Sequence, residues 1–280
     1  METIYFLVQQ TMLFSIPLLL VALGGMFSER SGVVNIALEG IMIIGAFTGI
    51  FFISRFGNLF SPTITLFIAI IISALSGLIF SLLHAYASIN MSADQVISGT
   101  ALNIFAPAFA IYVTRAIQVV QQISFVNNFR IESVPILGNI PIIGNLLFKN
   151  SYITTYLGFI ILALSWFALY KTRFGLRLRS CGEHPQAADS VGINVYKMRY
   201  FGVAISGALA GIGGLVFVIP TSTNFNATVA GYGFLALAVL IFGQWKPIRI
   251  LYAAFFFGLM KTLASAYSGI PILSNLPISN

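Results

Sequence analysis

The amino-acid sequence predicts an all-α fold, a polytopic transmembrane helix bundle of about eight spans. Of its 280 residues, 58% are hydrophobic and 8% are charged, whereas about a quarter of the residues of a soluble domain are charged. Uncharged runs long enough to cross a bilayer, which takes about 20 apolar residues, recur along the whole chain. This composition excludes an ordinary soluble enzyme, a disordered chain and a nucleic-acid-binding domain. The net charge of +7 therefore indicates basic loops beside a membrane.

The expected spans follow these uncharged runs in order. Residues 3–28 contain no Asp, Glu, Lys or Arg, and residues 200–245 form an uncharged run long enough for two passes. The first run lacks the basic start and the small-residue cleavage site of a signal peptide, so we expect it to remain in the membrane. The predicted helices cover residues 7–27, 33–53, 64–88, 95–114, 152–170, 200–219, 231–245 and 250–268.

Basic residues mark one loop as cytoplasmic. Segment 171–199 has Glu183 and Asp189 as its acidic residues, and its basic residues are Lys171, Arg173, Arg177, Arg179, Lys197 and Arg199. Because cytoplasmic loops carry an excess of Lys and Arg, we expect this segment inside the cell. Alternation of the spans then places the N-terminus outside, and it places three further loops in the cytoplasm, at residues 28–32, 89–94 and 246–249.

The long region without a predicted span, residues 116–150, then lies outside the cell. Its stretch 134–148 is apolar but is interrupted by residues that break helices, namely Pro135, Gly138, Pro141 and Gly144. We therefore expect a short strand or an interfacial segment over the outer mouth rather than a further span.

Two predicted spans have features of broken helices. The first, within residues 29–47, places Asn35 and Glu39 among apolar residues and glycines, and the second, residues 230–244, has glycines near both ends. Interrupted segments in two halves of opposite direction indicate an inverted repeat. Such breaks occur only where the backbone is buried in protein or lines a cavity.

A third interruption is expected in residues 94–107, which contain Gly99, Asn103 and Pro107. Glycine and proline both weaken a helix, and the Asn103 amide can donate and accept hydrogen bonds. We therefore expect a break in the helix predicted at residues 95–114.

Polar side chains inside the spans are candidates for a substrate path. A carboxylate in hydrocarbon is costly unless it faces protein or water, so Glu39 either caps a neighbouring backbone or lines the path. Asn35 and Asn103 could hydrogen-bond a polar solute or join helices. Lys261 could pair with Glu39 or with a carbonyl, or could extend to the interface.

Small residues in the span 200–219 are predicted to pack helices. Gly207, Gly211 and Gly214 recur at intervals of three or four residues. This spacing places them on one helix face and allows close backbone approach without a polar group.

A short amphipathic helix is predicted within the basic loop, in residues 179–200. Pro185 suits the first turn of a helix, residues 186–190 can continue it, and Gly192 suits the position that ends it. Such a capped helix could dock a soluble partner or could only connect two spans, and the residues by themselves leave both readings open.

The same loop resembles the cytoplasmic coupling loop of ABC importer permeases. The branch is the one that handles simple sugars, nucleosides and branched-chain amino acids. The matching residues are Gly182, Glu183, His184, Pro185, Ala187, Ala188, Gly192, Ile193, Asn194 and Val195, followed by ISGALAGIGG (205–214). Other stretches similar to family blocks are SGVVNIALEGIMIIGAF (31–47), ADQVISGTALN (93–103), IPIIGNLLF (140–148) and GYGFLALAVLIFGQWKP (231–247). The form Asn35-x-x-x-Glu39-Gly40 resembles the nucleoside and simple-sugar subgroup.

The resemblance implies the transmembrane subunit of an ATP-driven importer in the cell membrane. It would translocate a nucleoside or related simple sugar by alternating access. The implied partners are ABC ATPase subunits, a second permease subunit and an extracytoplasmic substrate-binding lipoprotein. By the match, residues His184 to Gly192 would press into an ATPase groove, and Asn35, Glu39 and Asn103 would lie near the translocation path.

No enzymatic activity and no cofactor are expected on this chain. It contains no Walker A pattern, so the resemblance places ATP and Mg on the partner ATPase. One cysteine, Cys181, and two distant histidines, His84 and His184, argue against a metal site. Members of the family carry a last span that has no counterpart after residue 268 of this sequence.

Other functions remain as alternatives. An ABC permease for branched-chain amino acids would use the same fold, and the amides of Asn35 and Asn103 do not distinguish a ribose from an amino acid. An ion-coupled secondary transporter would need intramembrane carboxylates, for which only Glu39 and marginally Asp94 are available. A membrane-embedded enzyme is disfavoured, since the chain has no H-E-x-x-H motif and no pair of intramembrane Asp residues.

Overall fold

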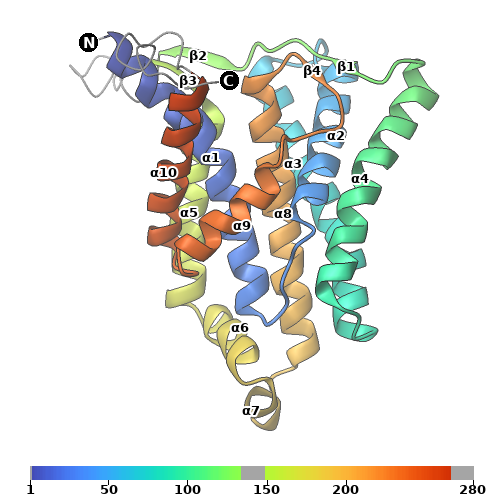
Figure 1. The fold of residues 1–280 in the computed structure, drawn as a ribbon, viewed down its shortest axis with the longest axis vertical. Coiled ribbons are helices and arrows are strands. Elements are labelled where there is room, and N and C mark those ends of the chain that lie inside the picture. Colours follow the sequence, from blue (N-terminus) through green and yellow to red (C-terminus); the bar gives the residue numbers. More distant parts are fainter. Residues whose placement is uncertain (1, 134–148, 266–280) are drawn as a thin grey trace, which may run out of the picture.

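The computed structural model describes residues 2–133 and 149–265 of the chain (Figure 1). The helices of this part are α1 (Glu2–Arg30), α2 (Leu38–Phe56), α3 (Pro62–Ala85), the π-helix η1 (Tyr86–Asn90), α4 (Gln95–Gln118), α5 (Ile153–Lys171), α6 (Arg173–Glu183), α7 (Pro185–Ser190), α8 (Val195–Thr221), α9 (Tyr232–Phe242) and α10 (Pro247–Ser265). The strands are β1 (Ile123–Ser124), β2 (Arg130–Ser133), β3 (Lys149–Tyr152) and β4 (Asn224–Phe225). The segment expected at 134–148 and the missing span expected after residue 268 lie outside the described residues.

Seven of the described helices are long and apolar enough to cross a membrane, namely α1, α2, α3, α4, α5, α8 and α10. They confirm the predicted all-α, polytopic bundle. The eighth expected span, residues 231–245, is the helix α9 of 11 residues. Its length is about 16 Å, roughly half of a hydrocarbon core about 30 Å thick. Helix α9 therefore enters the bundle without crossing it, and the inverted repeat stays a prediction.

The expected span 33–53 begins later than predicted, because α2 begins at Leu38. Residues 31–37, here called the unwound segment, connect α1 to α2 without helical structure. Gly32 has φ +90°, in the left-handed region that favours glycine, and the Ser28 hydroxyl donates to the Val33 carbonyl (2.7 Å). These local interactions end α1 and delay the start of α2.

The predicted break in residues 94–107 is wrong, because α4 is continuous from Gln95 to Gln118 and contains Pro107. A helix satisfies its own backbone groups in lipid, which favours continuity over a break. Gly99 does not break α4 but allows a close contact, since a Cβ atom at this position would lie only 2.9 Å from Ile36 Cβ. The glycine thus lets the unwound segment pass close to α4.

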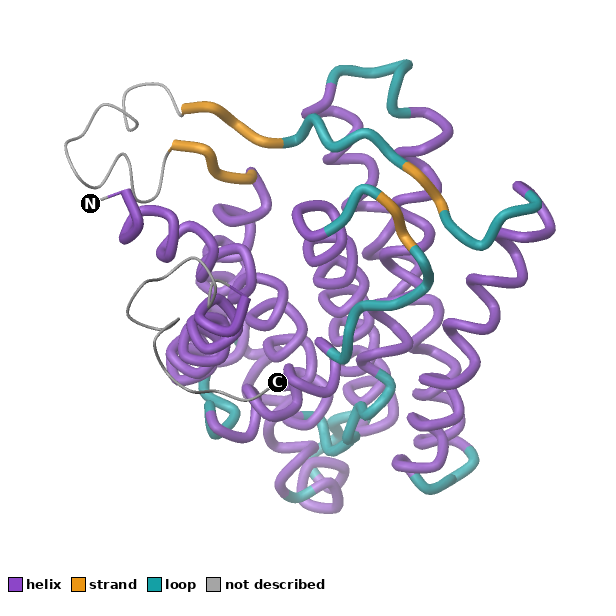
Figure 2. The backbone as a smooth tube through the Cα atoms, turned by 45° about the horizontal axis from the view of Figure 1, so that its top comes forward, coloured by secondary structure: helices purple, strands orange, loops and turns teal. Residues whose placement is uncertain are grey.

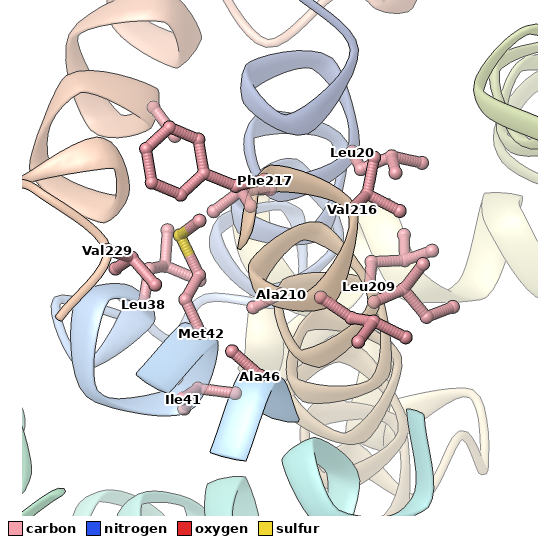
Figure 3. Close-up of a cluster of buried hydrophobic side chains, with 14 of the residues drawn as sticks. Leu20, Leu38, Ile41, Met42, Ala46, Leu209, Ala210, Val216, Phe217 and Val229 are labelled. Carbon is pink, nitrogen blue, oxygen red and sulfur yellow. The ribbon is translucent and has the colours of Figure 1, made fainter. Parts of the chain in front are cut away.

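Helix α8 lies at the centre of the bundle and packs against α1, α2 and α3. Its Gly211 meets Gly45 of α2 and Gly77 of α3 at backbone distance. Apolar side chains such as Met42 and Ala210 fill the space around these contacts (Figure 3). A central helix surrounded by other helices explains why α8 is the most buried of the candidate spans.

The three glycines predicted to pack helices lie at these interfaces. A Cβ atom at Gly207 or Gly211 would overlap atoms of α3, and one at Gly214 would overlap the backbone of α2. Any side chain at these positions requires the helices to separate.

The two ends of the bundle differ (Figures 1 and 2). At one end, here called the strand end, β1 pairs with β4 and β2 pairs with β3, both antiparallel. Asn127 ties this layer to α8 by donating to the Ile219 carbonyl (2.6 Å). At the other end, here called the α7 end, α6 and α7 project beyond the long helices (Figure 1).

The loops that were predicted to be cytoplasmic contact one another in the structure, and they lie near the α7 end. Tyr200 donates to the Asn90 side chain (2.5 Å), and Arg30 contacts both Glu183 and the Trp245 carbonyl. The cytoplasmic location of this end stays a prediction. Helix α6 was not predicted, since a single short helix was expected in residues 179–200.

We predict that Gly211→Ala destabilises the bundle by about 1–3 kcal/mol, because overpacking a tight contact forces backbone shifts. The added methyl group would overlap the Ser73 carbonyl and lie 3.1 Å from Gly77 Cα. Thermal unfolding of the purified chain in detergent measures the effect. The control is Ala204→Val in the same helix, which adds more volume at a partly exposed position beside a pocket. Equal stability of the two variants would contradict the prediction.

Candidate functional site

The N-termini of α2 and α9 meet inside the bundle at the carboxylate of Glu39. Its Oε1 accepts the backbone N–H of Gly231 (2.9 Å), and its Oε2 accepts the backbone N–H of Gly233 (2.6 Å). The Glu39 residue is 8% exposed. The carboxylate therefore caps the first turn of α9, where free N–H groups and the helix dipole favour negative charge.

Glycines at the start of α9 allow this approach. Gly231 has φ +78°, in the left-handed region. A Cβ atom at Gly233 would lie 2.8 Å from Glu39 Oε2 and would overlap the Glu39 backbone. The glycines read from the sequence as an interruption thus supply both the turn into α9 and its contact with α2.

Asn103 of α4 caps the start of α2. Its Oδ1 accepts the backbone N–H of Gly40 (2.7 Å), and its Nδ2 donates to the Ile36 carbonyl (2.9 Å). A Cβ atom at Gly40 would lie 2.7 Å from the Leu102 carbonyl oxygen, so the contact with α4 is tight. Both ends of the amide therefore hold the start of α2.

Asn35 lies in the unwound segment and is fully buried. Its Nδ2 donates to the Ser206 hydroxyl of α8 (2.9 Å), whereas its Oδ1 has no hydrogen-bond partner. Among the polar atoms of Asn35, Glu39 and Asn103 that are described here, this oxygen is the one that no protein group occupies.

Two further residues that sequence reasoning missed hold the unwound segment. His84 of α3 hydrogen-bonds the Val34 carbonyl through Nε2 (2.9 Å) and Ser98 through Nδ1 (3.1 Å). Gln95 of α4 accepts the Val34 N–H through Oε1 (2.7 Å). No local pattern signals these partners, because each lies 50 or more residues away in the sequence.

The structure thus brings together the three residues that were predicted for the substrate path. We call Asn35, Glu39, Asn103, the unwound segment and Gly231–Gly233 the half-helix crossing. Its hydrogen bonds satisfy backbone groups that two helices starting inside a bilayer would otherwise leave unpaired. Whether a solute contacts this crossing stays a prediction.

Lys261 lies beside the half-helix crossing but, within the described residues, does not pair with Glu39. On α10 it lines a pocket of about 440 Å³ together with Gln10 and Tyr232. The pairing considered from the sequence is therefore not found.

The predicted short helix in the basic loop is confirmed as α7, preceded by α6. Pro185 is its first residue, and Gly192 follows it with φ +82°. The Gly192 N–H bonds the Asp189 carbonyl (2.9 Å) and the Ile193 N–H bonds the Ala188 carbonyl (3.1 Å). These two bonds form a Schellman motif, which ends the helix as glycine at this position predicts.

The residues predicted to couple to an ATPase lie on both faces of α7. Ala188 is 3% exposed and packs against the bundle, whereas His184 and Ala187 are exposed and Pro185 is half-buried. Around Gly192 a Cβ atom would meet open space. The helix therefore has an anchored face and a small, exposed face. That these residues dock an ATPase stays a prediction.

No group of three or more His, Cys, Asp or Glu residues that could hold a metal ion occurs in the described part of the chain. Buried helix caps inside a bundle of seven long apolar helices are the arrangement of a polytopic membrane protein.

Comparison with known proteins identifies this class. Residues 7–278 match the family model described as branched-chain amino acid transport system / permease component. The chain is 42% identical to the nucleoside ABC transporter permease protein NupC of Lactococcus lactis, over 99% of this chain and 88% of the relative. It is 45% identical to the guanosine ABC transporter permease protein NupQ of Bacillus subtilis, over 97% and 85% respectively.

A third relative is the putative glucose ABC transporter permease protein TsgC13 of Haloferax volcanii, 31% identical over 88% of this chain and 73% of the relative. No solved structure matches the chain significantly. The chain belongs to this family of ABC transporter permeases. It is a transport subunit rather than an enzyme, and a multi-pass protein of the cell membrane.

We predict that Glu39→Ala lowers the free energy of unfolding by about 2 kcal/mol, because it leaves the buried N–H of Gly233 and the partly buried N–H of Gly231 unpaired. Glu39→Gln keeps one acceptor oxygen and should cost less. Thermal unfolding in detergent measures both changes, and amide hydrogen exchange at Gly231 and Gly233 locates them. The control is Asp189→Asn, an exposed carboxylate. Unchanged exchange at the two glycines in Glu39→Ala would contradict the capping role.

Proposed function

We propose that this chain is the transmembrane subunit of an ATP-driven importer for nucleosides. The observation that carries the proposal is identity of 42% and 45%, over nearly the whole chain, to relatives named as nucleoside and guanosine permeases. The relative named for glucose is more distant, at 31%. The family description mentions branched-chain amino acids, but the relatives cited here favour a nucleoside.

The geometry argues against an ion-coupled carrier. Such a carrier needs an intramembrane carboxylate that can bind and release a cation or proton. Glu39 instead has both oxygens bonded to backbone N–H groups of α9, and Asp94 caps α4 by accepting the N–H groups of Val96 and Ile97. Both carboxylates are therefore engaged in holding helix ends.

The proposed mechanism couples ATP to movement of the helices. ABC ATPase subunits, which carry ATP and Mg, dock on α7 in the cytoplasm and press on its exposed face. A second permease subunit completes the path, and an extracytoplasmic binding lipoprotein delivers the solute at the strand end. Rearrangement at the half-helix crossing then opens the path alternately to the two sides. We assign the Asn35 oxygen, which is buried and unpaired among the described residues, to contact the solute once that rearrangement exposes it.

We predict that Ala187→Arg abolishes ATP-dependent uptake without preventing membrane insertion. Ala187 is exposed on α7, and a long charged side chain there would hold the ATPase surface away. The measurement is uptake of labelled guanosine by cells that express the variant with its partners, next to the amount of the chain in the membrane. Ala187→Ser, which keeps the side chain small, is the control, and normal uptake by Ala187→Arg would overturn docking on α7.

The proposed function itself is tested by purifying the tagged full-length chain in a gentle detergent. We expect mass spectrometry to find an ABC ATPase and a second permease in the complex. A panel of unlabelled guanosine, glucose and leucine should then compete with labelled guanosine in that order of strength. Recovery of the chain alone, with transport in liposomes without ATP, would overturn the importer. Stronger competition by leucine would overturn the solute class.

A further inference from the structure

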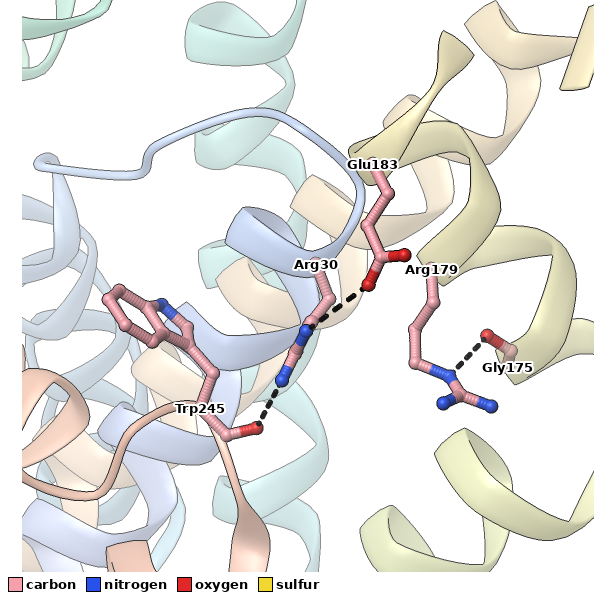
Figure 4. Close-up of polar contacts among 5 residues, drawn as sticks. All are labelled: Arg30, Gly175, Arg179, Glu183 and Trp245. Carbon is pink, nitrogen blue, oxygen red and sulfur yellow. Dashed lines mark hydrogen bonds and ion pairs between the residues drawn. The ribbon is translucent and has the colours of Figure 1, made fainter. Parts of the chain in front are cut away.

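We propose that Arg30, the last residue of α1, is a positioning residue that carries movement of α6 and α7 to α9. The inference rests on the proposed function, in which an ATPase acts on α7. Its basis is that the end of α1 contacts the segment before α7 on one side and the turn after α9 on the other (Figure 4).

On the side of α6, the contact is between backbones. A Cβ atom at Gly182 would lie 2.9 Å from the Arg30 carbonyl carbon and 3.2 Å from the Gly32 nitrogen. The Arg30 Nη1 atom also lies 3.8 Å from Glu183 Oε1, in a pair whose carboxylate side chain is 69% exposed. An exposed pair at this distance contributes little by itself. Displacement of α6 therefore reaches α1 through the close contact at Gly182.

On the side of α9, two hydrogen bonds hold Trp245. The Arg30 Nη2 donates to the Trp245 carbonyl (3.3 Å), and the indole Nε1 donates to the Glu29 carboxylate (2.5 Å). Both bonds involve a charged group, which strengthens them. Glu29 and Arg30 thus bind the backbone and the side chain of one residue.

The turn that contains Trp245 is strained. Gln244 and Trp245 have φ values of +51° and +53°, in the left-handed region that side chains other than glycine rarely adopt. Such conformations persist only where the surroundings determine them. Trp245 is held by the bonds from Glu29 and Arg30, by its own N–H bond to the Leu240 carbonyl (3.4 Å) and by packing of its side chain against the hydrophobic core.

Helix α9 connects this turn to the half-helix crossing. Its far end donates the Gly231 and Gly233 N–H groups to Glu39, at the start of α2. We expect this helix of 11 residues to move as a rigid piece, so that a shift of Trp245 displaces the N–H groups that Glu39 accepts. The route from the α7 end to the crossing therefore runs through α6, the end of α1 and α9.

The test measures whether α6 and the turn after α9 move together. Spin labels are placed at Arg177→Cys in α6 and Lys246→Cys, both exposed, with the buried Cys181 replaced by Ala. The distance between the labels is measured in the full complex without nucleotide and with trapped ATP. We expect the same distance in both states when Arg30 is present, and a shift with ATP in Arg30→Gln. The control is Arg249→Gln in the first turn of α10, which removes the contact with the Gln244 side chain but neither bond to Trp245, and should behave like the parent.

A second variant tests the same link in case Arg30→Gln fails to fold. Trp245→Phe keeps an aromatic ring and removes only the indole N–H, so the complex should form in normal yield. We expect uptake per ATP hydrolysed to fall about tenfold while basal ATPase activity stays within about twofold, the size expected for one charge-assisted bond. A merely structural role would lower uptake, ATPase activity and yield together.

The outcomes separate this inference from the proposed function. Identical nucleotide dependence of the label distance with and without Arg30, in a complex that contains the ATPase, overturns the link alone. Unchanged uptake per ATP in Trp245→Phe does the same. A preparation that contains no ATPase overturns the importer and the link together.

Discussion

The carboxylate of Glu39 on the N-terminus of α9 is the interaction on which the rest of the structure depends. Two helices begin inside the bundle, and the bilayer offers no water for their first N–H groups. Glu39 satisfies two of these groups on α9, and Asn103 satisfies one on α2. Without such acceptors, broken helices at membrane depth would carry unpaired donors, each costing about 1–3 kcal/mol.

Packing around α8 makes the crossing possible. Glycines of α2, α3 and α8 meet without side chains between them, so the backbone that carries Glu39 lies close to the central helix. The same close approach places the buried Asn35 within reach of Ser206. The polar groups are thus held by a rigid apolar frame, which suits a site whose geometry must change only when the frame itself moves.

Short helices lie between the α7 end and the half-helix crossing. Helix α7 is anchored through Ala188 and capped at Gly192, and α6 lies directly on the end of α1. Helix α9 connects the turn at Trp245 with the crossing. An importer needs such a path, because the energy of ATP is released outside the membrane while the solute barrier lies within it.

The sequence by itself determined the seven long apolar helices and α7. Charged residues are too costly in hydrocarbon to occur freely there, so uncharged runs locate the long helices, and local cap chemistry at Pro185 and Gly192 locates α7. It also identified Asn35, Glu39 and Asn103 as unusual. Only the tertiary structure decided the short length of α9, the continuity of α4 and the partners of these side chains. Glu39 and Gly233 lie 194 residues apart, and packing of the whole chain, rather than any local pattern, brings them together.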